Sequence, residues 1–233
     1  MSGPVLKAEG VCRSFGSLRV LDGLDLEAAQ GEFLGIIGRS GTGKSTLLGI
    51  LGTHDLEFEG RLELGGRDVK SAGQAGLASM RRDILGYVFQ DFHLLPELTA
   101  LENAILPAVF AGRDAESARN SAIDIMDQLG VRIDDTPTAM LSRGERQRVA
   151  VARGLVNRPG VLLADEPSAS LDDENENILF DMLDGLRRKQ GFTLIAVVHS
   201  HAVLSRADRV LELREGRLHP SGGIVPPDGG SGS

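Results

Sequence analysis

The stretch "FLGIIGRSGTGKST", residues 33–46, decides the fold of this chain. Residues 33–37 form an apolar run of strand length, and residues 38–46 fit the pattern G-x-x-x-x-G-K-[ST]. The apolar segment 46–51 that follows is expected to be a helix. Backbone N–H groups of a glycine-rich turn and of a helix N-terminus together surround a phosphate anion, so the stretch predicts a phosphate-binding loop.

Two residues of this loop have predicted roles of their own. Lys44 is expected to reach the β- and γ-phosphates of a nucleotide, and the hydroxyl of Ser45 is expected to bind Mg²⁺. The alternative is an ordinary glycine turn. A strand before the pattern and a helix after it favour the phosphate loop.

Further β-type runs follow along the chain, and helical patterns separate several of them. Most of these runs are nearly continuous in apolar residues, as expected for strands covered on both faces of a parallel sheet. Residues 174–189 open with acidic residues, close with basic residues and precede Gly191, which predicts a helix. The alternation of strands and helices predicts an α/β fold. The β-type runs are residues 33–37, 86–90, 161–165, 193–198 and 209–213.

Residues 91–158 differ from the rest because they carry helical signals without a convincing strand. Thr99 and Glu102 form a T-x-x-E capping box at the start of one predicted helix, and Gly130 follows the end of another. We therefore expect a helical subdomain inserted into the α/β core.

The chain is expected to form one domain over residues 1–219. Its core would comprise residues 1–90 and 159–219, with an antiparallel β-layer that includes the N-terminal part and "GRLELGG" (60–66). Residues 220–233 are rich in Gly, Ser and Pro and are expected to be a disordered tail.

The composition limits the class of protein. The chain has 233 residues, 33 of them acidic and 25 basic, and its formal net charge of −8 disfavours a nucleic-acid partner. No segment reads as a signal peptide or reaches the length of a membrane span, so we expect a cytoplasmic location. Cys12 is the single cysteine, which excludes an intrachain disulfide, and we expect it to be a small buried hydrophobe.

Polar residues stand at the ends of three other predicted strands. Because ligands of open α/β sheets bind at the carboxyl ends of strands, Asp165 is expected to hold the metal and Glu166 to orient an attacking water. Without the phosphate loop, a solvated acidic turn would be the better interpretation of this pair. His199 is structural or catalytic, or pairs with His201 at a metal site, and Gln90 coordinates the metal or caps a loop. Neither His199 nor Gln90 would be assigned a function alone.

Taken together, these motifs stand in the order and approximate spacing of the ATP-binding cassette (ABC) family. The chain resembles the ATPase subunit of an ABC transporter over about residues 5–218. The resemblance implies a phosphate-loop core with a mostly parallel sheet, an antiparallel β-layer and a helical subdomain. The motifs are "GRSGTGKST" (38–46), Gln90, "LSRGE" (141–145), "VLLADEP" (161–167), "SLD" (170–172) and His199.

The resemblance implies a role for each residue that faces a bound ATP. Ser45 and Gln90 contact Mg²⁺, and Asp165 holds the ion through water. Glu166 polarises the hydrolytic water, and His199 is bonded to the γ-phosphate. The residues that wrap the phosphates are Gly38, Arg39, Ser40, Gly41, Thr42, Gly43, Lys44, Ser45 and Thr46. In addition, Phe15 takes the position that stacks on adenine, for which a buried core phenylalanine is the alternative.

Other motifs imply a second copy of the chain. Ser142, Gly144 and Glu145 belong to the signature motif, which acts on ATP held by the other subunit, and Asp172 belongs to a loop linking the two active sites. Ser142 and Glu145 also form an S-x-x-E capping box, so Gly144 lies in the first turn of a helix whose N-terminus favours an anion. We therefore expect a homodimer that closes around two ATP molecules and drives an integral membrane permease from the cytoplasmic face.

A finer resemblance comes from "FQDFHLLPELTALENAILP" (89–107) and the glutamate of "LSRGE". These segments are similar to the lipoprotein-releasing and macrolide-export group, the LolD-like and MacB-like ATPases. Cell-division and peptide-resistance ATPases share much of the pattern. Outside the transporters, the alternatives are a phosphate-loop kinase and an ABC ATPase of DNA repair or translation.

Arg143 departs from the family, which usually has L-S-G-G at this point. A glycine here could serve a positive φ or close approach of the partner subunit, both of which arginine opposes. Alternatively, the guanidinium could reach a phosphate or an acidic group across the dimer, or the exchange could be neutral.

Overall fold

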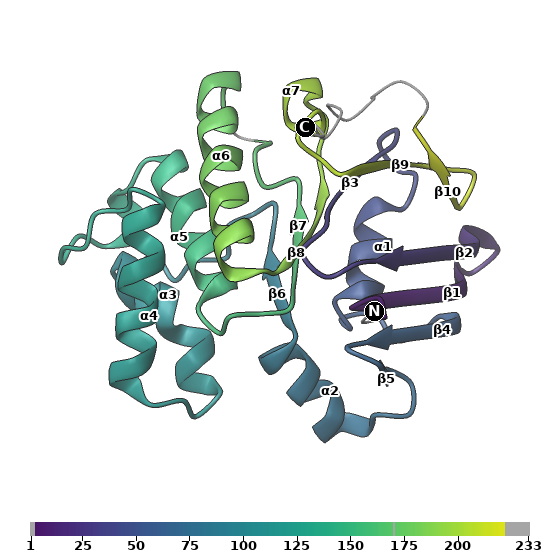
Figure 1. Cartoon of the computed structure of the whole chain (residues 1–233), viewed down its shortest axis with the longest axis horizontal. Helices are drawn as coiled ribbons and strands as arrows, with labels where there is room; N and C mark the ends of the chain where they lie inside the picture. The colour runs from purple at the N-terminus through teal and green to yellow at the C-terminus, as the bar shows by residue number, and fades with distance from the viewer. Residues whose placement is uncertain (1–2, 170, 222–233) are drawn as a thin grey trace, which may run out of the picture.

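A computed structural model describes residues 3–169 and 171–221. Within them two β-sheets lie next to each other, with helices α3, α4 and α5 grouped at the far side of the larger sheet (Figure 1). The α/β fold class expected from the sequence is confirmed, including a mostly parallel core sheet and an antiparallel layer.

The core sheet has six strands in the order β10, β9, β3, β8, β7, β6. All neighbours are parallel except β9 and β10, which form an antiparallel pair. The phosphate-loop strand β3 is therefore an interior strand, and apolar clusters cover both of its faces, which explains its continuous apolar sequence. The strands are β3 (Phe33–Ile37), β6 (Leu85–Val88), β7 (Val161–Asp165), β8 (Thr193–Val197), β9 (Arg209–Arg214) and β10 (Arg217–Pro220).

The second sheet has four antiparallel strands in the order β2, β1, β4, β5. Helix α1 (Lys44–Leu51) lies between the two sheets, because its apolar side chains share one buried cluster with residues of β1, β2 and β4. Figure 1 shows α1 between β3 and this layer. The strands are β1 (Leu6–Phe15), β2 (Leu18–Ala28), β4 (Glu59–Leu64) and β5 (Arg67–Asp68).

Alternate residues of the core strands face two separate apolar clusters. Leu34 and Ile36 of β3 belong to the cluster around α1, whereas Phe33 belongs to the cluster that contains α3 to α6. The rings of Phe33 and Phe180 stack with centroids 6.1 Å apart. The period of two along a strand thus fixes one helix layer to each face of the sheet. The remaining core helices are α2 (Gly73–Asp83), α6 (Asp173–Gln190) and α7 (His201–Leu204).

The segment between β6 and β7 contains α3 (Ala100–Phe110), α4 (Ala115–Gln128), the short 3₁₀ helix η1 (Thr138–Met140) and α5 (Arg143–Leu155). The predicted capping box at α3 is present, since the Thr99 hydroxyl accepts from the backbone N–H of Glu102 at 3.2 Å and the Glu102 carboxylate accepts from that of Thr99 at 2.8 Å. Gly130 follows α4 with φ of 59°. The division into a core and a helical subdomain at 91–158 stays our proposal.

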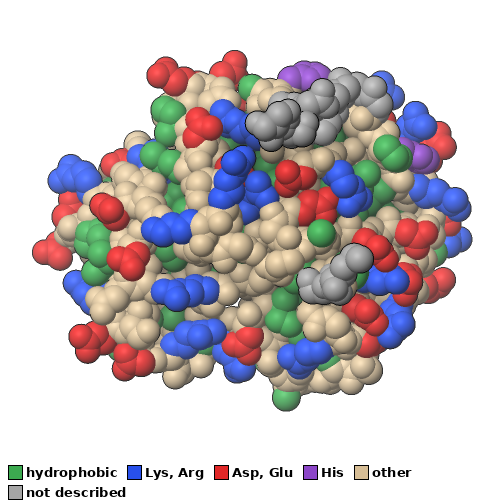
Figure 2. Space-filling view, in the orientation of Figure 1, with side chains coloured by type: hydrophobic (Ala, Val, Ile, Leu, Met, Phe, Trp, Pro, Cys, Tyr) green, Lys and Arg blue, Asp and Glu red, His purple; other side chains and the backbone are tan. Residues whose placement is uncertain are grey.

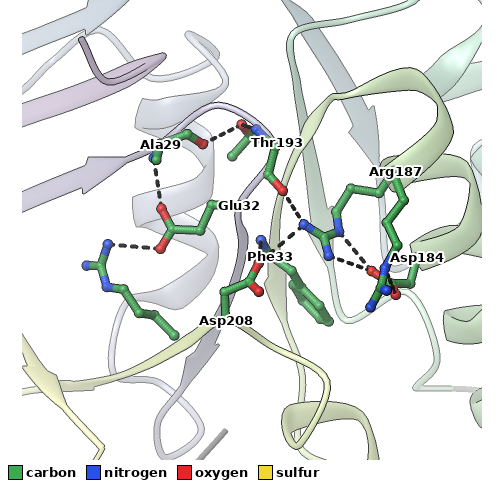
Figure 3. A network of polar contacts seen from close by, with 10 residues as sticks. Ala29, Glu32, Phe33, Asp184, Arg187, Thr193 and Asp208 are labelled. Carbon is green, nitrogen blue, oxygen red and sulfur yellow. Dashed lines mark hydrogen bonds and ion pairs between the residues drawn. The ribbon is translucent and has the colours of Figure 1, made fainter. Parts of the chain in front are cut away.

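A polar network ties together the amino-terminal ends of the core strands (Figure 3). Arg187 of α6 is 6% exposed. Its guanidinium contacts Asp184 at 2.7 Å and Asp208 at 3.2 Å and donates to the carbonyl of Gly31. Asp208 also accepts from the backbone N–H of Phe33 at 2.7 Å, which joins α6 to the first residue of β3. The network lies at the sheet edge opposite the phosphate loop.

The charged surface is mixed in sign. On the face drawn in Figure 2, Lys and Arg side chains are interspersed with Asp and Glu side chains. Exposed ion pairs such as Arg82 with Asp83 at 2.7 Å and Arg61 with Glu63 at 2.5 Å are typical of this surface. Pairs of this kind add little to stability, because water solvates both partners.

The expectations for Cys12 and for the start of the tail need correction, and parts of the predicted tail and of "SLD" lie outside the described residues. Cys12 is only half-buried, and its sulfur accepts hydrogen bonds from Arg19 at 2.9 Å and from the N–H of Gly23 at 3.0 Å, so it is not a plain buried hydrophobe. Pro220 ends β10, whereas 222–233 of the predicted tail, and Ser170 of "SLD", lie outside the described residues. No helix of the described part is long and apolar enough to cross a membrane.

Candidate active site

The predicted phosphate loop opens onto a hollow of about 390 Å³ at the carboxyl ends of the core strands. Residues from three different strand ends meet there: the loop after β3, Gln90 after β6 and Glu166 after β7. The sequence interpretation therefore brought together residues that lie more than a hundred positions apart. The lining residues are Val20, Ser40, Gly41, Gly43, Lys44, Ser45, Thr46, Gln90 and Glu166.

The loop is shaped to receive an anion. Helix α1 begins at Lys44, and no side chain caps its first turn, so its N–H groups are left for a ligand. The ammonium group of Lys44 is 2.9 Å from the carbonyl of Gly38 and 3.1 Å from that of Arg39, so it lies across the inside of the loop. Gly43 has φ of 101°, and a β-carbon there would lie 2.5 Å from Val20. Only glycine fits this position.

The carboxylates after β7 differ in environment. Burial raises the pKa of Asp165, and the neighbouring charge of Glu166 acts in the same direction, whereas the Ser45 hydroxyl and the Lys44 charge oppose the shift. Glu166 has φ of 45°, in the left-handed region that residues with a β-carbon rarely adopt. One of its carboxylate oxygens is 3.0 Å from Nε2 of His199. The pair Glu166 and His199 was not predicted as a contact, although both residues were predicted separately.

The signature residues do not line this hollow. Ser142 precedes α5 and caps it: its hydroxyl accepts from the N–H of Glu145 at 3.3 Å, while the Glu145 carboxylate accepts from the Ser142 N–H at 2.9 Å. These bonds from Ser142 hold the pKa of Glu145 below its usual range. Gly144 lies in the first turn beside Leu171. The predicted capping box is present, and none of these three residues lines the hollow of their own chain.

Two further predicted residues also lie outside the hollow. Asp172 is the N-cap of α6, and its carboxylate accepts from the backbone N–H of Asn175 at 2.8 Å. Phe15 is 50% exposed at the end of β1, so the alternative of a buried core phenylalanine is wrong. Its exposed ring is available to a ligand.

A profile of the family described as ABC transporter matches residues 21–169. The chain belongs to the ABC transporter family. It is an ATP-binding and ATP-hydrolysing subunit of this family, as the resemblance implied.

Curated relatives of this ABC ATPase include "Lipoprotein-releasing system ATP-binding protein LolD" of Xanthomonas euvesicatoria pv. vesicatoria, which is 42% identical over 220 residues, 92% of this chain and 90% of that protein. The protein of the same name from Bacteroides fragilis is 44% identical over 216 residues, 92% of this chain and 100% of that one.

Among solved structures, the dimeric MJ0796, a bacterial ABC transporter cassette, is similar with a TM-score of 0.84 at 33% identity, covering 92% of this chain and 96% of that one. A post-hydrolysis dimeric structure of MJ0796 bound to ADP and Pi has a TM-score of 0.83 at the same 33% identity, with coverage of 92% and 96%.

The sequence interpretation missed a second hollow, of about 270 Å³, between the ABC core and α3 and α5. Aromatic rings line it: Tyr87 and Phe89 stack with centroids 4.2 Å apart, and His54 meets Tyr87 at 5.1 Å. Arg153 of α5 donates hydrogen bonds to the carbonyls of Phe92 and His93 and so holds the segment after Gln90 in place. The backbone of His93 has a positive φ of 47°. The residues lining this groove are Gly52, His54, Arg81, Leu85, Gly86, Tyr87, Phe89, His93, Pro107, Arg153, Gly154 and Asn157.

The local sequence pattern gives little indication of this groove. Its aromatic residues are spread over β6, the loop after β6 and the segment after α1, and each one alone is typical of a core residue. The one available signal was "FQDFH" (89–93), an aromatic-rich run directly after a strand.

Proposed function

We propose that the chain binds ATP with Mg²⁺ in the hollow at the carboxyl ends of the core strands. The observation that carries this proposal is the convergence of the uncapped start of α1, Lys44, Ser45, Gln90 and Glu166 on one hollow. Residues Gly38 to Thr46 surround the phosphates. Ser45, Gln90 and Asp165 supply the oxygen ligands that Mg²⁺ prefers, and the ion neutralises phosphate charge when bound.

In this proposal Glu166 and His199 act on the hydrolytic step. The Glu166 carboxylate orients a water molecule toward the γ-phosphate and accepts its proton, and His199, 3.0 Å from that carboxylate, donates a hydrogen bond to the γ-phosphate. Lys44 stabilises the negative charge that builds up on the transferred phosphoryl group.

We further propose that two copies close around two ATP molecules. Ser142, Gly144 and Glu145 lie at a helix N-terminus outside the hollow of their own chain, where they are free to meet the phosphate held by a second copy. Asp172 lies beside Leu171, which borders Gly144, and so belongs to the same surface. The dimeric cassettes among the similar structures support this arrangement.

For the membrane partner, we propose an integral permease that places a short segment in the groove lined by Tyr87, Phe89 and His54. Three exposed apolar side chains lie on the adjoining loop and α3: Leu95 is 48%, Val109 51% and Phe110 85% exposed. Apolar exposure around an aromatic groove is a sign of a protein interface. The chain would then be held at the cytoplasmic face of the membrane.

We propose release of lipoproteins as the transport process, because relatives covered almost end to end carry that name. Drug or peptide export and a force-transmitting role in cell division are the alternatives. The membrane partner and its cargo distinguish them: co-purification with a lipoprotein-releasing permease and ATP-dependent lipoprotein release in proteoliposomes would support the proposal.

The nucleotide site itself is tested by two variants. Lys44→Ala is expected to abolish tight ATP binding, since the positive charge inside the loop is lost; unchanged affinity in calorimetry would refute the site. Glu166→Gln is expected to bind ATP, hydrolyse it slowly and accumulate as dimer. Light scattering that finds only monomer with ATP would contradict the two-copy arrangement. Phosphate release without any acceptor would exclude a kinase.

The groove is tested by Phe110→Ser, which removes the most exposed apolar side chain of α3, the helix whose Pro107 lines the groove. This variant is expected to keep the basal ATPase activity and to lose binding to the permease in detergent. Ile178→Ser on α6, 40% exposed, is the matched control and is expected to keep both. Equal binding by the two variants would argue against the groove.

A further inference from the structure

One face of the Phe15 ring is already covered. The guanidinium carbon of Arg13 lies 4.3 Å from the ring centroid of Phe15. The two residues are two positions apart on β1, where the pairing with β2 shifts register between Arg13 and Ser14. A cation this close to an aromatic face is attracted by the negative charge of the ring face. Phe15 therefore offers a ligand only its other face, while half of the residue remains exposed.

Arg13 is itself held from several directions. Its Nε is 2.8 Å from Asp55, its Nη2 is 3.0 Å from Glu57, and its Nη1 donates to the carbonyl of Ser14 at 3.1 Å. The Arg13 side chain is 12% exposed, whereas Asp55 is 22% exposed and accepts a further bond from the N–H of Glu57 at 2.9 Å. The loop after α1 thus fixes the guanidinium plane against the ring.

The stack of Arg13 on Phe15 lies on the same hairpin as Val20, which lines the phosphate hollow. Phe15 pairs with Leu18 across the turn between β1 and β2, and Val20 of the same hairpin lines the hollow beside Gly43. A nucleotide with its phosphates on the loop would therefore leave the hollow past Val20, along the hairpin that carries Phe15.

We propose that Arg13 is a positioning residue for the nucleobase: it backs the Phe15 ring and presents the free face of that ring to adenine. The inference rests on the proposed nucleotide site, and specifically on Phe15 as the stacking residue. Two physical effects act together. A ring that is already fixed loses less conformational freedom when the base binds. A cation on one face also draws electron density from the ring, which favours stacking of an electron-rich purine on the other face.

The experiment compares ligands with and without a base. Arg13→Met is expected to raise the Kd for ATP about two- to fivefold, the range of a partly exposed cation–π contact. It should raise KM for ATP by the same factor without changing kcat. Affinity for inorganic tripolyphosphate, which occupies only the phosphate loop, should not change. Arg13→Lys keeps the charge but loses the planar stack. Its Kd for ATP is expected to lie between that of the natural chain and that of Arg13→Met.

Arg19→Met is the matched control. Arg19 lies on the same hairpin, pairs with Asp22 at 2.7 Å and contacts Cys12, but among the described residues it makes no cation–π contact with Phe15. Its variant is expected to bind ATP and tripolyphosphate as the natural chain does. A rise in Kd equal to that of Arg13→Met would assign the effect to the hairpin as a whole and overturn the proposal.

Phe15→Ala separates this inference from the proposed site. If Phe15→Ala binds ATP normally, the stacking role of Phe15 fails and the inference fails with it. If Phe15→Ala weakens ATP binding but Arg13→Met does not, only the role of Arg13 is refuted. In the Phe15→Ala background, Arg13→Met should have no further effect on Kd, since there is no ring left to hold. Weaker tripolyphosphate binding by Arg13→Met would also overturn the proposal.

Discussion

Replacement of Arg187 by methionine tests how the two ends of the core sheet depend on each other. Methionine keeps the helix propensity and much of the aliphatic length of arginine but removes the guanidinium from the network in Figure 3. Asp184, Asp208 and the carbonyl of Gly31 each lose a donor. The Arg187 side chain is 7% exposed, so those partners lose a buried cation rather than a solvated one.

The loss of stability depends on whether each partner of Arg187 can be rehydrated or keeps another cation after the substitution. Removing one member of a buried ion pair costs about 3–5 kcal/mol. Here Asp208 is 53% exposed and can be rehydrated, and Asp184 keeps a contact of 2.9 Å with Arg188. We therefore expect a loss of about 2–3 kcal/mol in the free energy of unfolding. At about 2–4 °C per kcal/mol for a chain of this size, the melting temperature should fall by about 4–12 °C.

The assay is urea unfolding followed by far-UV circular dichroism, because the chain has no tryptophan to report by fluorescence. Arg188→Met is the matched control: it removes a neighbouring arginine that contacts the same carboxylate but is 74% exposed. That change should cost about 0.5 kcal/mol or less. ATP affinity of Arg187→Met, measured well below its melting temperature, should equal that of the natural chain. Equal losses of stability in the two variants would refute the reasoning.

Three further predictions concern the nucleotide site and the signature helix. Ser142→Ala should lower stability by about 1 kcal/mol through loss of the cap on α5, whereas Ser142→Asp should prevent ATP-dependent dimerisation by repelling the partner's phosphate; melting curves and light scattering with ATP check both effects. Asp165→Asn should make the nucleotide-free protein more stable near neutral pH, because burial raises the pKa of Asp165 and its charge opposes folding there. The gain should shrink as the pH falls through the raised pKa and should vanish below the ordinary value of 3.8, where Asp165 is protonated in both states; a gain independent of pH in urea titrations would contradict this cause. Arg143→Gly should leave the ATP affinity of the isolated subunit unchanged, since Arg143 lies at the start of α5 and outside the hollow; a weaker affinity in calorimetry would mean that the residue acts within its own chain.

The fold could be predicted largely from local patterns. The run before Gly38 identified β3, and the nearly continuous apolar runs at 161–165 and 193–198 identified two further parallel strands, β7 and β8, because strands covered on both faces leave no polar alternation. The capping boxes at Thr99 and Ser142 set the starts of α3 and α5 to the residue. Such signals are readable because the interacting residues are three positions apart.

Features made by distant residues could not be predicted in this way. The groove beside Tyr87 and the anchoring of the loop after Gln90 by Arg153 depend on how α5 packs against β6, which no short pattern records. The same holds for the stack of Arg13 on Phe15, although the two residues are neighbours on one strand: its geometry depends on Asp55 of a separate loop. The structure shows whether the backbone at position 143 requires the glycine that the family usually has there. The residue has no positive φ, so a glycine is not required here by the backbone.

The left-handed backbone of Glu166 has a consequence for how this protein balances stability against activity. A residue with a β-carbon in this conformation costs about 1 kcal/mol or more relative to glycine, so Glu166→Gly should fold more tightly and hydrolyse nothing. A search for thermostable variants that ignores activity would therefore select against the very carboxylate proposed to act on water. Directed evolution of this cassette for stability needs ATP turnover as a simultaneous selection.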